Sequence, residues 1–501
     1  MSRSVVLAII AGVALTAAGS GQAAARTCTL GTSNAADLHA ARRIIGGQTR
    51  GFERSLAGIS ASHRRAAGAT FAAAVAAYLY GFPQVMMQRT IDSYPVNVMV
   101  SIGKLADTST VTVVAPNHDT LYSVAQLDLT RGPIVVQTPP TAGRYSVIQL
   151  IDVFTNVAGY VGDGSRGRTG DAALVVPPGW RGSVPAGVRV IRPASPSLWL
   201  LGRTVATGRA DTASAVALLA RYSLTPLADY EAGKRRGSLV LPDFPAGRKP
   251  IMAPTGTAFF DELGADLAAD PAPRADACAL ARFASVGIGP RMTASTATGL
   301  RGRALRAAAA AGPRVLTSFS AAARHQPGRQ VNGWATTPHD IARFRTDYLT
   351  RALIAQIGLG VNTIEKALYP IADRDSRGRP LTGAHDYVVH FAPGQLPPVR
   401  QFWSLTLYDK RILFYPNRLQ RFAVGDRTPG LRRDARGGGL TIYLSNRDPG
   451  AARRSNWLPA PRQRFSLYLR LYEPRPAAST NRWRPPSIRR IRALRPKLMG
   501  A

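Results

Sequence analysis

The chain has 501 residues, of which 45% are hydrophobic and 19% are charged, a composition typical of a folded protein with room for two or more domains. Its formal net charge is +35, and the basic residues, mostly arginine, are scattered along the chain and form no blocks. The scatter favours a solvated cationic surface, with adhesion to anionic polymers of a cell envelope as the alternative. We expect no nucleic-acid partner, because the sequence contains no recognisable nucleic-acid-binding module.

The first 25 residues have the pattern of a signal peptide. Arg3 precedes an apolar run from Val5 to Ala18, and the small residues Ala23-Ala24-Ala25 follow. The run is shorter than the ~20 residues that span a bilayer, and we identify no longer one, so the mature chain is predicted to have no transmembrane segment. We therefore predict cleavage near Ala25 and an exported protein that is secreted, periplasmic or bound to the cell wall.

The chain contains two cysteines, Cys28 and Cys278. An oxidising compartment would allow a disulfide between them, while two free thiols are the alternative. Their spacing argues against a metal site.

The first half of the chain is predicted to be a mobile arm followed by a β-domain. Residues 26–65 show no sustained periodicity and are the expected arm. Within the expected N-terminal β-domain, 66–250, a helix over 70–82 is bent or ended by Pro83. Strands follow from about Val111 to Ala206, and the runs 121–129, 134–137 and 145–153 are typical of a β-meander.

Alanine-rich segments over 251–335 predict a helical connector, with helices over 258–268, 275–283, 304–311 and 313–323. Gly312-Pro313 is expected to separate the last two helices. The C-terminal domain, 336–488, is predicted to open with a helix toward Ile357 and to continue as a jelly roll. Residues 489–501 are expected to be a disordered basic tail. The predicted fold class is mainly β with a helical connector (α+β), with two β-sandwich or jelly-roll domains.

Two sets of short motifs stand out in the sequence. The N-terminal motifs are 117–123 (NHDTLYS), 143–145 (GRY), Asp152 and 199–204 (WLLGRT). The C-terminal motifs are 332–334 (NGW), 369–370 (YP), 402–409 (FWSLTLYD), 456–461 (NWLPAP) and 483–486 (WRPP). The N-terminal motifs resemble domain of unknown function 1254, and the C-terminal motifs resemble its usual partner, domain of unknown function 1214. The resemblance covers roughly residues 66–488 and implies an extracytoplasmic, β-rich protein with a connection to carbohydrate processing.

Familiar catalytic motifs are absent from the sequence. It has no HExxH helix, phosphate-binding Gly-Lys-Ser/Thr loop, GxGxxG turn or GxSxG elbow, which argues against zinc-protease, P-loop, Rossmann and α/β-hydrolase chemistry. The seven histidines lack the spacing of a metal pair on a helix. We therefore predict no metal and no cofactor.

The remaining chemistry is acid–base work by carboxylates. Asp119 and Asp152 fall at the ends of neighbouring predicted strands and are the predicted catalytic pair, with Arg144 to hold an anion and Tyr122 to donate a hydrogen bond. In the structural alternative, Asn117 and Asp119 form an Asx turn and Asp152 pairs with Arg144. The predicted substrate-binding residues of this half are Asn117, His118, Asn156 and Arg203.

In the second half, aromatic side chains could stack on sugar rings, although aromatic residues in strands are usually core. The predicted platform consists of Trp334, Trp403, Tyr408 and Trp457.

Together these features predict an exported protein that processes or binds a glycan, with hydrolysis by carboxylates if it is an enzyme. The alternative is a non-catalytic binding or scaffolding protein of the envelope. The expected partner is a glycan or an anionic envelope polymer, and the sequence does not indicate an oligomeric state.

Overall fold

The computed structural model describes residues 28–32, 34–164, 169–245, 247–326, 329–435 and 437–492, and the chain forms two compact units. The helical unit combines the chain up to Phe82 with residues 254–319 and 345–352. The sheet unit combines residues 83–253, 320–344 and the chain from Leu353 onward. The predicted signal peptide and residues 493–501 of the predicted tail lie outside the described residues.

The helical unit begins with a helix where a mobile arm was expected. After the 3-10 turn η1 (Cys28–Leu30), α2 (Ala35–Arg54) starts at Asn34, whose side-chain oxygen accepts hydrogen bonds from the amides of Ala36 and Asp37. The inward face of α2 is lined by Asp37, Ala41 and Ile45, four residues apart. The arm prediction was wrong for this segment because small alanines hid the helical period.

Two further helices run through the prolines that were expected to end or bend them. The helix predicted over 70–82 is confirmed, but α3 (Ala61–Ile91) is longer and contains Pro83. By length and composition, α3 is apolar enough to cross a membrane, yet 72% of its most apolar window is buried inside the protein, as in the core helix of a folded domain.

The predicted break at Gly312-Pro313 is wrong, because α8 (Gly299–Arg324) is continuous. A Cβ atom at Gly312 would lie 2.4 Å from the Tyr78 ring, so this glycine allows α8 to approach α3 closely. With α6 (Ala258–Ala269) and α7 (Ala277–Ala284), these helices make the expected connector part of a helical unit.

A disulfide and a buried carboxylate hold the helical unit together. Cys28 and Cys278 form a disulfide that joins η1 to α7, with their Cα atoms 6.0 Å apart. One turn away, buried Asp276 accepts hydrogen bonds from the hydroxyls of Tyr80 and Tyr348, both at 2.8 Å. The guanidinium of Arg351 stacks on both tyrosine rings. The disulfide option left open by the sequence is thus the one that the structure adopts.

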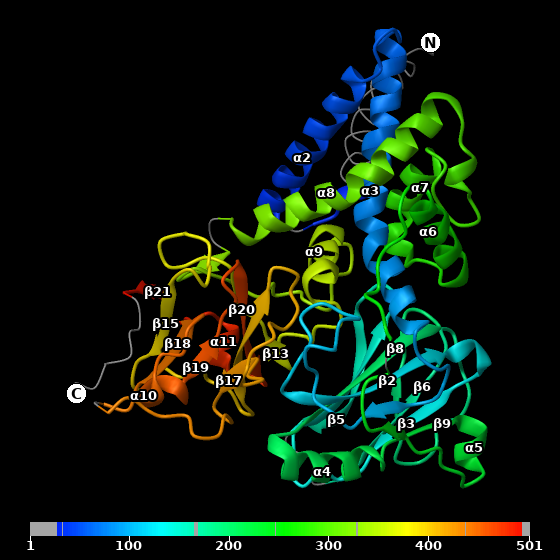
Figure 1. Cartoon of the computed structure of the whole chain (residues 1–501). Coiled ribbons are helices and arrows are strands. Elements are labelled where there is room, and N and C mark those ends of the chain that lie inside the picture. Colours follow the sequence, from blue (N-terminus) through cyan, green and yellow to red (C-terminus); the bar gives the residue numbers. More distant parts are fainter. Residues whose placement is uncertain are drawn as a thin grey trace, which may run out of the picture. The chain divides into compact units, whose positions relative to one another are not determined.

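The N-terminal half of the sheet unit contains two sheets, which share one apolar core (Figure 1). In the larger sheet β8 (Ser197–Val205) lies between β2 (Thr120–Asp128) and β4 (Ser146–Asp152). Strand β3 (Ile134–Thr138) belongs to the smaller sheet, so the expected meander was wrong. The larger sheet has the order β10 (Leu239–Leu241), β1 (Val100–Ile102), β2 (Thr120–Asp128), β8 (Ser197–Val205), β4 (Ser146–Asp152), β5 (Val157–Gly164). The smaller sheet has the order β7 (Arg189–Ile191), β6 (Asp171–Val175), β3 (Ile134–Thr138), β9 (Ser223–Pro226). The helices of this half are α4 (Gly208–Leu219) and α5 (Leu227–Glu231).

The C-terminal half of the sheet unit repeats this plan with two other sheets and a second shared core. The path through the larger sheet is β11 (Gln330–Val331), β12 (Trp334–Ala335), β14 (Ile371–Ala372), β20 (Phe465–Tyr472), β16 (Trp403–Asp409), β17 (Ala423–Gly425), and β13 (Ala367–Leu368) also pairs with β20. The smaller sheet has the order β19 (Trp457–Pro459), β18 (Leu440–Ser445), β15 (Asp386–Phe391), β21 (Ile488–Ile491). The remaining helices are α9 (Tyr348–Gly358), α10 (Ala451–Arg454) and α11 (Pro476–Ser479).

The end of the described chain corrects the expected tail. Residues 489–491 belong to β21, which pairs with β15 over Asp386–Val389, because Ile488 supplies a buried apolar anchor. Over the described residues, helix accounts for 31% and strand for 24%, so the fold is α+β with more helix than the expected mainly β architecture.

Candidate functional site

The site begins with the alternation of side chains along β2 and β8. In β8, Leu198 and Leu200 point into the core between the two N-terminal sheets, so Trp199, Leu201 and Arg203 occupy the opposite face. The same alternation places Tyr122 and Val124 of β2 on that opposite face. Tyr122 is the direct cross-strand partner of Arg203.

Strand β20 presents a matching face from the C-terminal half. Its residues 467–472 read Leu-Tyr-Leu-Arg-Leu-Tyr, and the three leucines are in the C-terminal core. Tyr468, Arg470 and Tyr472 therefore occupy the other face. The polar side chains on these outward faces of β2, β8 and β20 line the same cavity. Each half of the sheet unit therefore contributes one wall of it.

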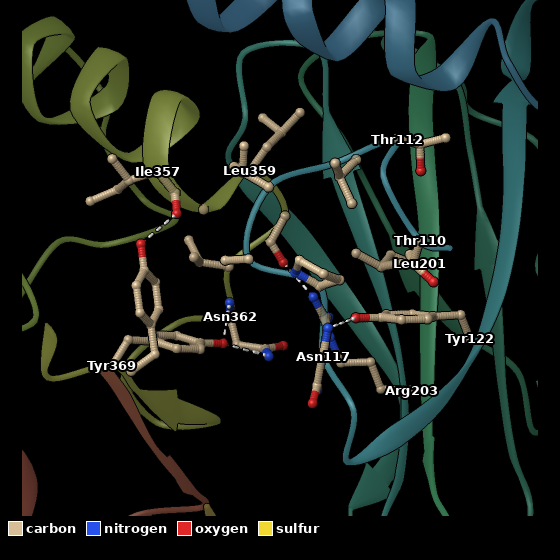
Figure 2. A pocket seen from close by; sticks show the side chains of 18 of the residues that line it. Thr110, Thr112, Asn117, Tyr122, Leu201, Arg203, Ile357, Leu359, Asn362 and Tyr369 are labelled. Carbon is tan, nitrogen blue, oxygen red and sulfur yellow. Dashed lines mark hydrogen bonds between the residues drawn. The ribbon is translucent and has the colours of Figure 1, made fainter. Parts of the chain in front are cut away.

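These walls enclose a cavity of about 330 Å³ inside the sheet unit, a volume typical of small-molecule sites. Much of the lining is aliphatic, from Val111 and Val113 near β1 to Ile354 and Ile357 of α9. Figure 2 shows Asn117, Tyr122 and Arg203 on one side and Asn362 and Tyr369 on the other. The cavity is thus an apolar chamber with a few polar groups.

Two tyrosine hydroxyls in the lining are held by backbone amides. The Tyr122 hydroxyl accepts from the amide of Asn117 at 3.1 Å, and the Tyr369 hydroxyl accepts from the amide and the side-chain Nδ2 of Asn362 at 3.0 and 2.9 Å (Figure 2). Burial raises the pKa of Tyr122, which therefore stays neutral and keeps its proton. Each hydroxyl can still donate one hydrogen bond to a ligand.

Two buried arginines give the cavity its positive charge. Arg203 is 8% exposed and donates to Gln149 Oε1 at 2.5 Å and to the carbonyl of Gly360 at 2.6 Å. Gly360 has a φ of +82°, a conformation that suits glycine and lets its carbonyl face the guanidinium. Arg470 is 4% exposed and donates to Thr406 Oγ1, to the Tyr408 hydroxyl and to a backbone carbonyl. All these acceptors are neutral.

The pKa of Arg470 shows that its charge is retained. Burial alone would lower this pKa. The neighbouring Tyr408 and Tyr472 and the carboxylate of Asp119 raise it by more than burial lowers it, so the net direction of the pKa is upward. Five arginines line the cavity in all, and among the described residues its lining contains no Asp, Glu, His, Lys or Cys. The lining itself therefore carries a net positive charge.

Three buried polar atoms of lining residues have no hydrogen-bond partner in the described part of the chain. They are Oδ1 of Asn362, a fully buried residue, the indole Nε1 of Trp199 and Nε of Arg324. A buried polar group without a partner costs about 1–3 kcal/mol, and most such groups in proteins are satisfied by water or a ligand. One unpaired acceptor and two unpaired donors thus belong to the lining of the same chamber.

Asp119 stands behind this wall, outside the cavity lining. Its Oδ2 accepts from Ser404 Oγ at 2.6 Å and from the Tyr472 hydroxyl at 2.9 Å, and the same hydroxyl accepts from Nδ2 of Asn117 at 2.8 Å. The Asn117 side-chain oxygen accepts from the Asp119 amide at 2.8 Å, which is the Asx turn of the structural alternative. Asp119 therefore fixes the position of Tyr472.

Asp152 lies at the other end of the sheet, so the predicted catalytic pair is wrong. The Asp119 carbonyl bonds to the amide of Ala206, whereas Asp152 is opposite Leu198 on β8. Eight strand residues separate these two points, or about 26 Å at ~3.3 Å per residue. Carboxyl groups that cleave a glycosidic bond lie about 5–9.5 Å apart. Asp152 instead accepts from the amide of Asn156 at 2.8 Å.

The other residues predicted in this half have structural contacts. Arg144 forms an ion pair with Asp211 at 2.6 Å, which corrects the alternative in which it pairs with Asp152. His118 Nδ1 lies 2.6 Å from a backbone carbonyl oxygen, and Asn156 accepts from the Phe344 amide at 2.9 Å. Of the eight residues predicted in the first half, Asn117, Tyr122 and Arg203 line the cavity.

The predicted aromatic platform is not an exposed surface. Trp334 and Trp403 belong to the C-terminal core, and the Trp334 indole donates to a backbone carbonyl. Trp457 is buried in β19 and donates to the carbonyl of Ser445 at 3.0 Å. Tyr408 is fully buried beside Arg470. These side chains were misjudged because strand aromatics usually fill the core.

The described residues contain no group of three or more His, Cys, Asp or Glu side chains arranged to bind a metal ion. The polar groups that line the cavity are instead tyrosine, arginine, asparagine, serine, threonine and the Trp199 indole.

Family models match both halves of the sheet unit. Residues 96–226 match the family described as "Protein of unknown function (DUF1254)", and residues 366–476 match "Protein of unknown function (DUF1214)". The two matches follow one another along the chain in that order. The DUF1254 region supplies Tyr122 and Arg203 to the cavity, and the DUF1214 region supplies Tyr369 and Arg470. The pairing of the two regions thus completes one chamber.

A solved structure shares the fold of this chain. The VPA0106 protein from Vibrio parahaemolyticus is 25% identical with a TM-score of 0.59, over 84% of this chain and all of that one. An uncharacterised protein from Burkholderia cenocepacia is 14% identical with a TM-score of 0.41, over 91% of this chain and 96% of that one. No curated protein matches the chain.

Sequence reasoning missed most of the DUF1214 wall. Arg470 and Tyr472 carry a readable signal, because a strict Leu-polar-Leu alternation means that one face of β20 is not core. Asn362 lies in a loop without a motif, and only its unpaired Oδ1 atom draws attention to it.

Proposed function

We propose that this chain is an exported binding protein for a small, mainly apolar molecule with an acidic group, held in the cavity of the sheet unit. The observation that carries the proposal is the charge of the chamber. Five arginines, of which Arg203 and Arg470 are buried, line a chamber whose described residues include no carboxylate. The one carboxylate that acts on Arg470 is Asp119, which lies outside the lining and already accepts from Ser404 and Tyr472. A buried charge is favourable when a counter-charge accompanies it, and an acidic ligand would supply one.

The polar groups of the lining support one orientation of such a ligand. The acidic group would lie at Arg203 and the Tyr122 hydroxyl, which are adjacent across β2 and β8. A hydroxyl or amine elsewhere on the ligand would donate to Oδ1 of Asn362, the unpaired acceptor. The aliphatic walls would enclose the remainder, at about 25 cal/mol for each Å² of apolar surface removed from water.

Binding fits the cavity better than carboxylate hydrolysis does. Asp119 and Asp152 lie at opposite ends of β8, and neither lines the chamber. A glycan is also a poorer occupant, because the aliphatic walls leave few partners for sugar hydroxyls. The proposal therefore follows the alternative of a non-catalytic binding protein.

Export is the second part of the proposal. It is supported by the Cys28–Cys278 disulfide, because such bonds persist in oxidising compartments and are rare in the cytosol. Amino-terminal sequencing of the secreted protein should find a start near Arg26. A product that accumulates in the cytoplasm with Met1 retained would refute export.

We further infer that each pair of sheets is a β-sandwich. Support comes from the single core that each pair of sheets shares. The parallel pairs β1–β10, β6–β7 and β18–β19 make an antiparallel jelly roll the poorer description.

Calorimetric titration with octanoate and 1-octanol tests the ligand class, since the two share a chain and differ in charge. Octanoate should bind about tenfold more tightly, which corresponds to ~1.4 kcal/mol for a charged hydrogen bond. Arg203→Met should remove this preference and leave octanol binding unchanged. Tyr122→Phe removes one hydroxyl only and should reduce the preference even if Arg203→Met fails to fold.

Arg131→Met is the matched control, because Arg131 is an exposed arginine paired with Asp128 and is not part of the lining. It should bind octanoate like the wild type. Equal affinity for the acid and the alcohol in the wild type, or an equal loss in the Arg131 variant, would refute the proposed role of the buried arginines.

A further inference from the structure

A second hollow, which we call the arginine groove, lies in the C-terminal half of the sheet unit. Its volume is about 1230 Å³, and no residue lines both it and the apolar cavity. Five separate stretches of chain between Ser376 and Arg492 contribute to its lining. The arginines used in the argument below are Arg377, Arg447, Arg462, Arg489, Arg490 and Arg492.

The charge of the groove is strongly one-sided. All six of these arginines are exposed, and a seventh, Arg379, is paired with the buried carboxylate of Asp375 at 2.7 Å. Within the part of the chain that the structure describes, the lining contains one carboxylate, Asp386, at the start of β15. Like charges gathered on a concave surface reinforce one another and attract a polyanion. Scattered arginines of the sequence thus converge in one place.

The other side chains of the groove indicate which polyanion it would take. Among the described residues the lining has no Phe, Tyr or Trp, and so no aromatic face on which the bases of a single-stranded nucleic acid could stack. None of the exposed large apolar residues of the described chain lies in it, so it has no anchor for a membrane. Asn446 and Ser376 add neutral hydrogen-bonding groups suited to hydroxyls, and His385 adds its ring nitrogens.

We propose that the arginine groove binds an acidic polysaccharide, a chain whose carboxylates pair with the arginines and whose hydroxyls meet the neutral polar groups. The groove is concave and built from several segments, as expected for a site that follows an extended polymer. This function does not depend on the ligand of the apolar cavity, because the two sites have separate linings.

Binding of polygalacturonate to the full mature chain tests the proposal, with uncharged dextran as the reference polymer. The groove variant combines Arg462→Gln, Arg489→Gln and Arg490→Gln. Its affinity should be about tenfold weaker, since each exposed charge pair contributes about two- to threefold. Raising the ionic strength from 50 to 500 mM should weaken wild-type binding, because surface attraction is screened.

The control variant removes the same charge from α2 by Arg42→Gln, Arg43→Gln and Arg50→Gln, which are exposed positions on a different unit. It should bind within twofold of the wild type. An equal loss in both triple variants would overturn the groove in favour of diffuse attraction by the net charge. A groove variant that melts early is replaced by Arg377→Gln with Arg447→Gln, which are outside strands.

Two further ligands separate the polysaccharide from other polyanions. Vesicles with phosphatidylglycerol and a single-stranded oligonucleotide are titrated in the same buffer. Tighter binding of either one than of polygalacturonate, with a loss in the groove variant, would overturn the assignment to a polysaccharide. Binding of dextran as tight as that of polygalacturonate would overturn the role of charge.

Discussion

Asp119→Asn is the substitution that best separates a structural from a catalytic role for the NHD motif. The carboxylate accepts two hydrogen bonds, from Ser404 Oγ at 2.6 Å and from the Tyr472 hydroxyl at 2.9 Å. Both bonds end on Oδ2, so asparagine with its amide oxygen at that position keeps both, but as bonds to a neutral acceptor. Its NH₂ group takes the place of Oδ1.

The size of the effect follows from these contacts. A hydrogen bond to a charged group contributes about 1.5–3 kcal/mol and one to a neutral group about 0.5–1.5 kcal/mol, so each of the two bonds should weaken by about 1–1.5 kcal/mol. We expect the free energy of unfolding of the sheet unit to fall by about 3 kcal/mol. At about 2 °C per kcal/mol for a unit of this size, its melting temperature should fall by about 6 °C.

Differential scanning calorimetry of the wild type and four variants measures this effect. Asp243→Asn is the control, because Asp243 pairs with Lys104 on the surface and should cost under about 1 kcal/mol. Tyr472→Phe combined with Asp119→Asn should be less destabilising than the sum of the two single variants, since both act on the same bond. An Asp119→Asn protein that melts like the wild type but has lost a polysaccharide-cleaving activity of the wild type would refute the positioning role.

Three further predictions concern other parts of the molecule. Replacing Cys28 and Cys278 by serine should lower the stability of the helical unit by about 2–5 kcal/mol in denaturant titrations, and a reductant should have no effect on that variant. Asp276→Asn should destabilise the same unit by about 2 kcal/mol, because the carboxylate accepts from two buried tyrosine hydroxyls; unchanged thermal unfolding would contradict this. Burial, opposed by Arg427 and the Trp403 amide, raises the pKa of Asp426 to about 6, above the ~4 of an unfolded carboxyl. The stability that the protonated folded form contributes is therefore complete below about pH 4 and is lost as the pH rises through about 6. Asp426→Asn should flatten the dependence of the melting temperature on pH, by the equivalent of up to about 1 kcal/mol for this exposed side chain. Parallel curves for the variant and the wild type would contradict the shift.

The sequence predicted the strands of both halves well, because their signals are local. The runs around Leu121, Val147, Val389, Leu405 and Leu469 are apolar or alternating and rich in β-branched and aromatic residues, and each became a buried strand. The paired family regions were also predicted correctly and in order. Periodicity and motifs depend on neighbouring residues only, so no knowledge of the fold is required.

Sheet order could not be predicted from the same signals. The alternation of β2 and β4 is compatible with direct pairing, but β8 inserts between them from about 70 residues away. This order separates Asp119 from Asp152 and rules out the catalytic pair that their positions in the sequence suggested. Pairing of distant strands depends on the total burial in the folded chain, which local propensity does not contain.

The sequence alone determined what the candidate residues are, and the tertiary structure decided where their charges gather. Tyr122 and Arg203 were identified from their motifs, but their partners Asn362 and Arg470 come from the other half of the chain. The first and last arginines of the groove, Arg377 and Arg492, are likewise more than 100 residues apart in the sequence. From the sequence, these arginines were therefore interpreted as scattered. A sequence gives the number and type of charged groups, whereas the electrostatic potential depends on the distances between them, and those distances are fixed only when the strands pair and pack.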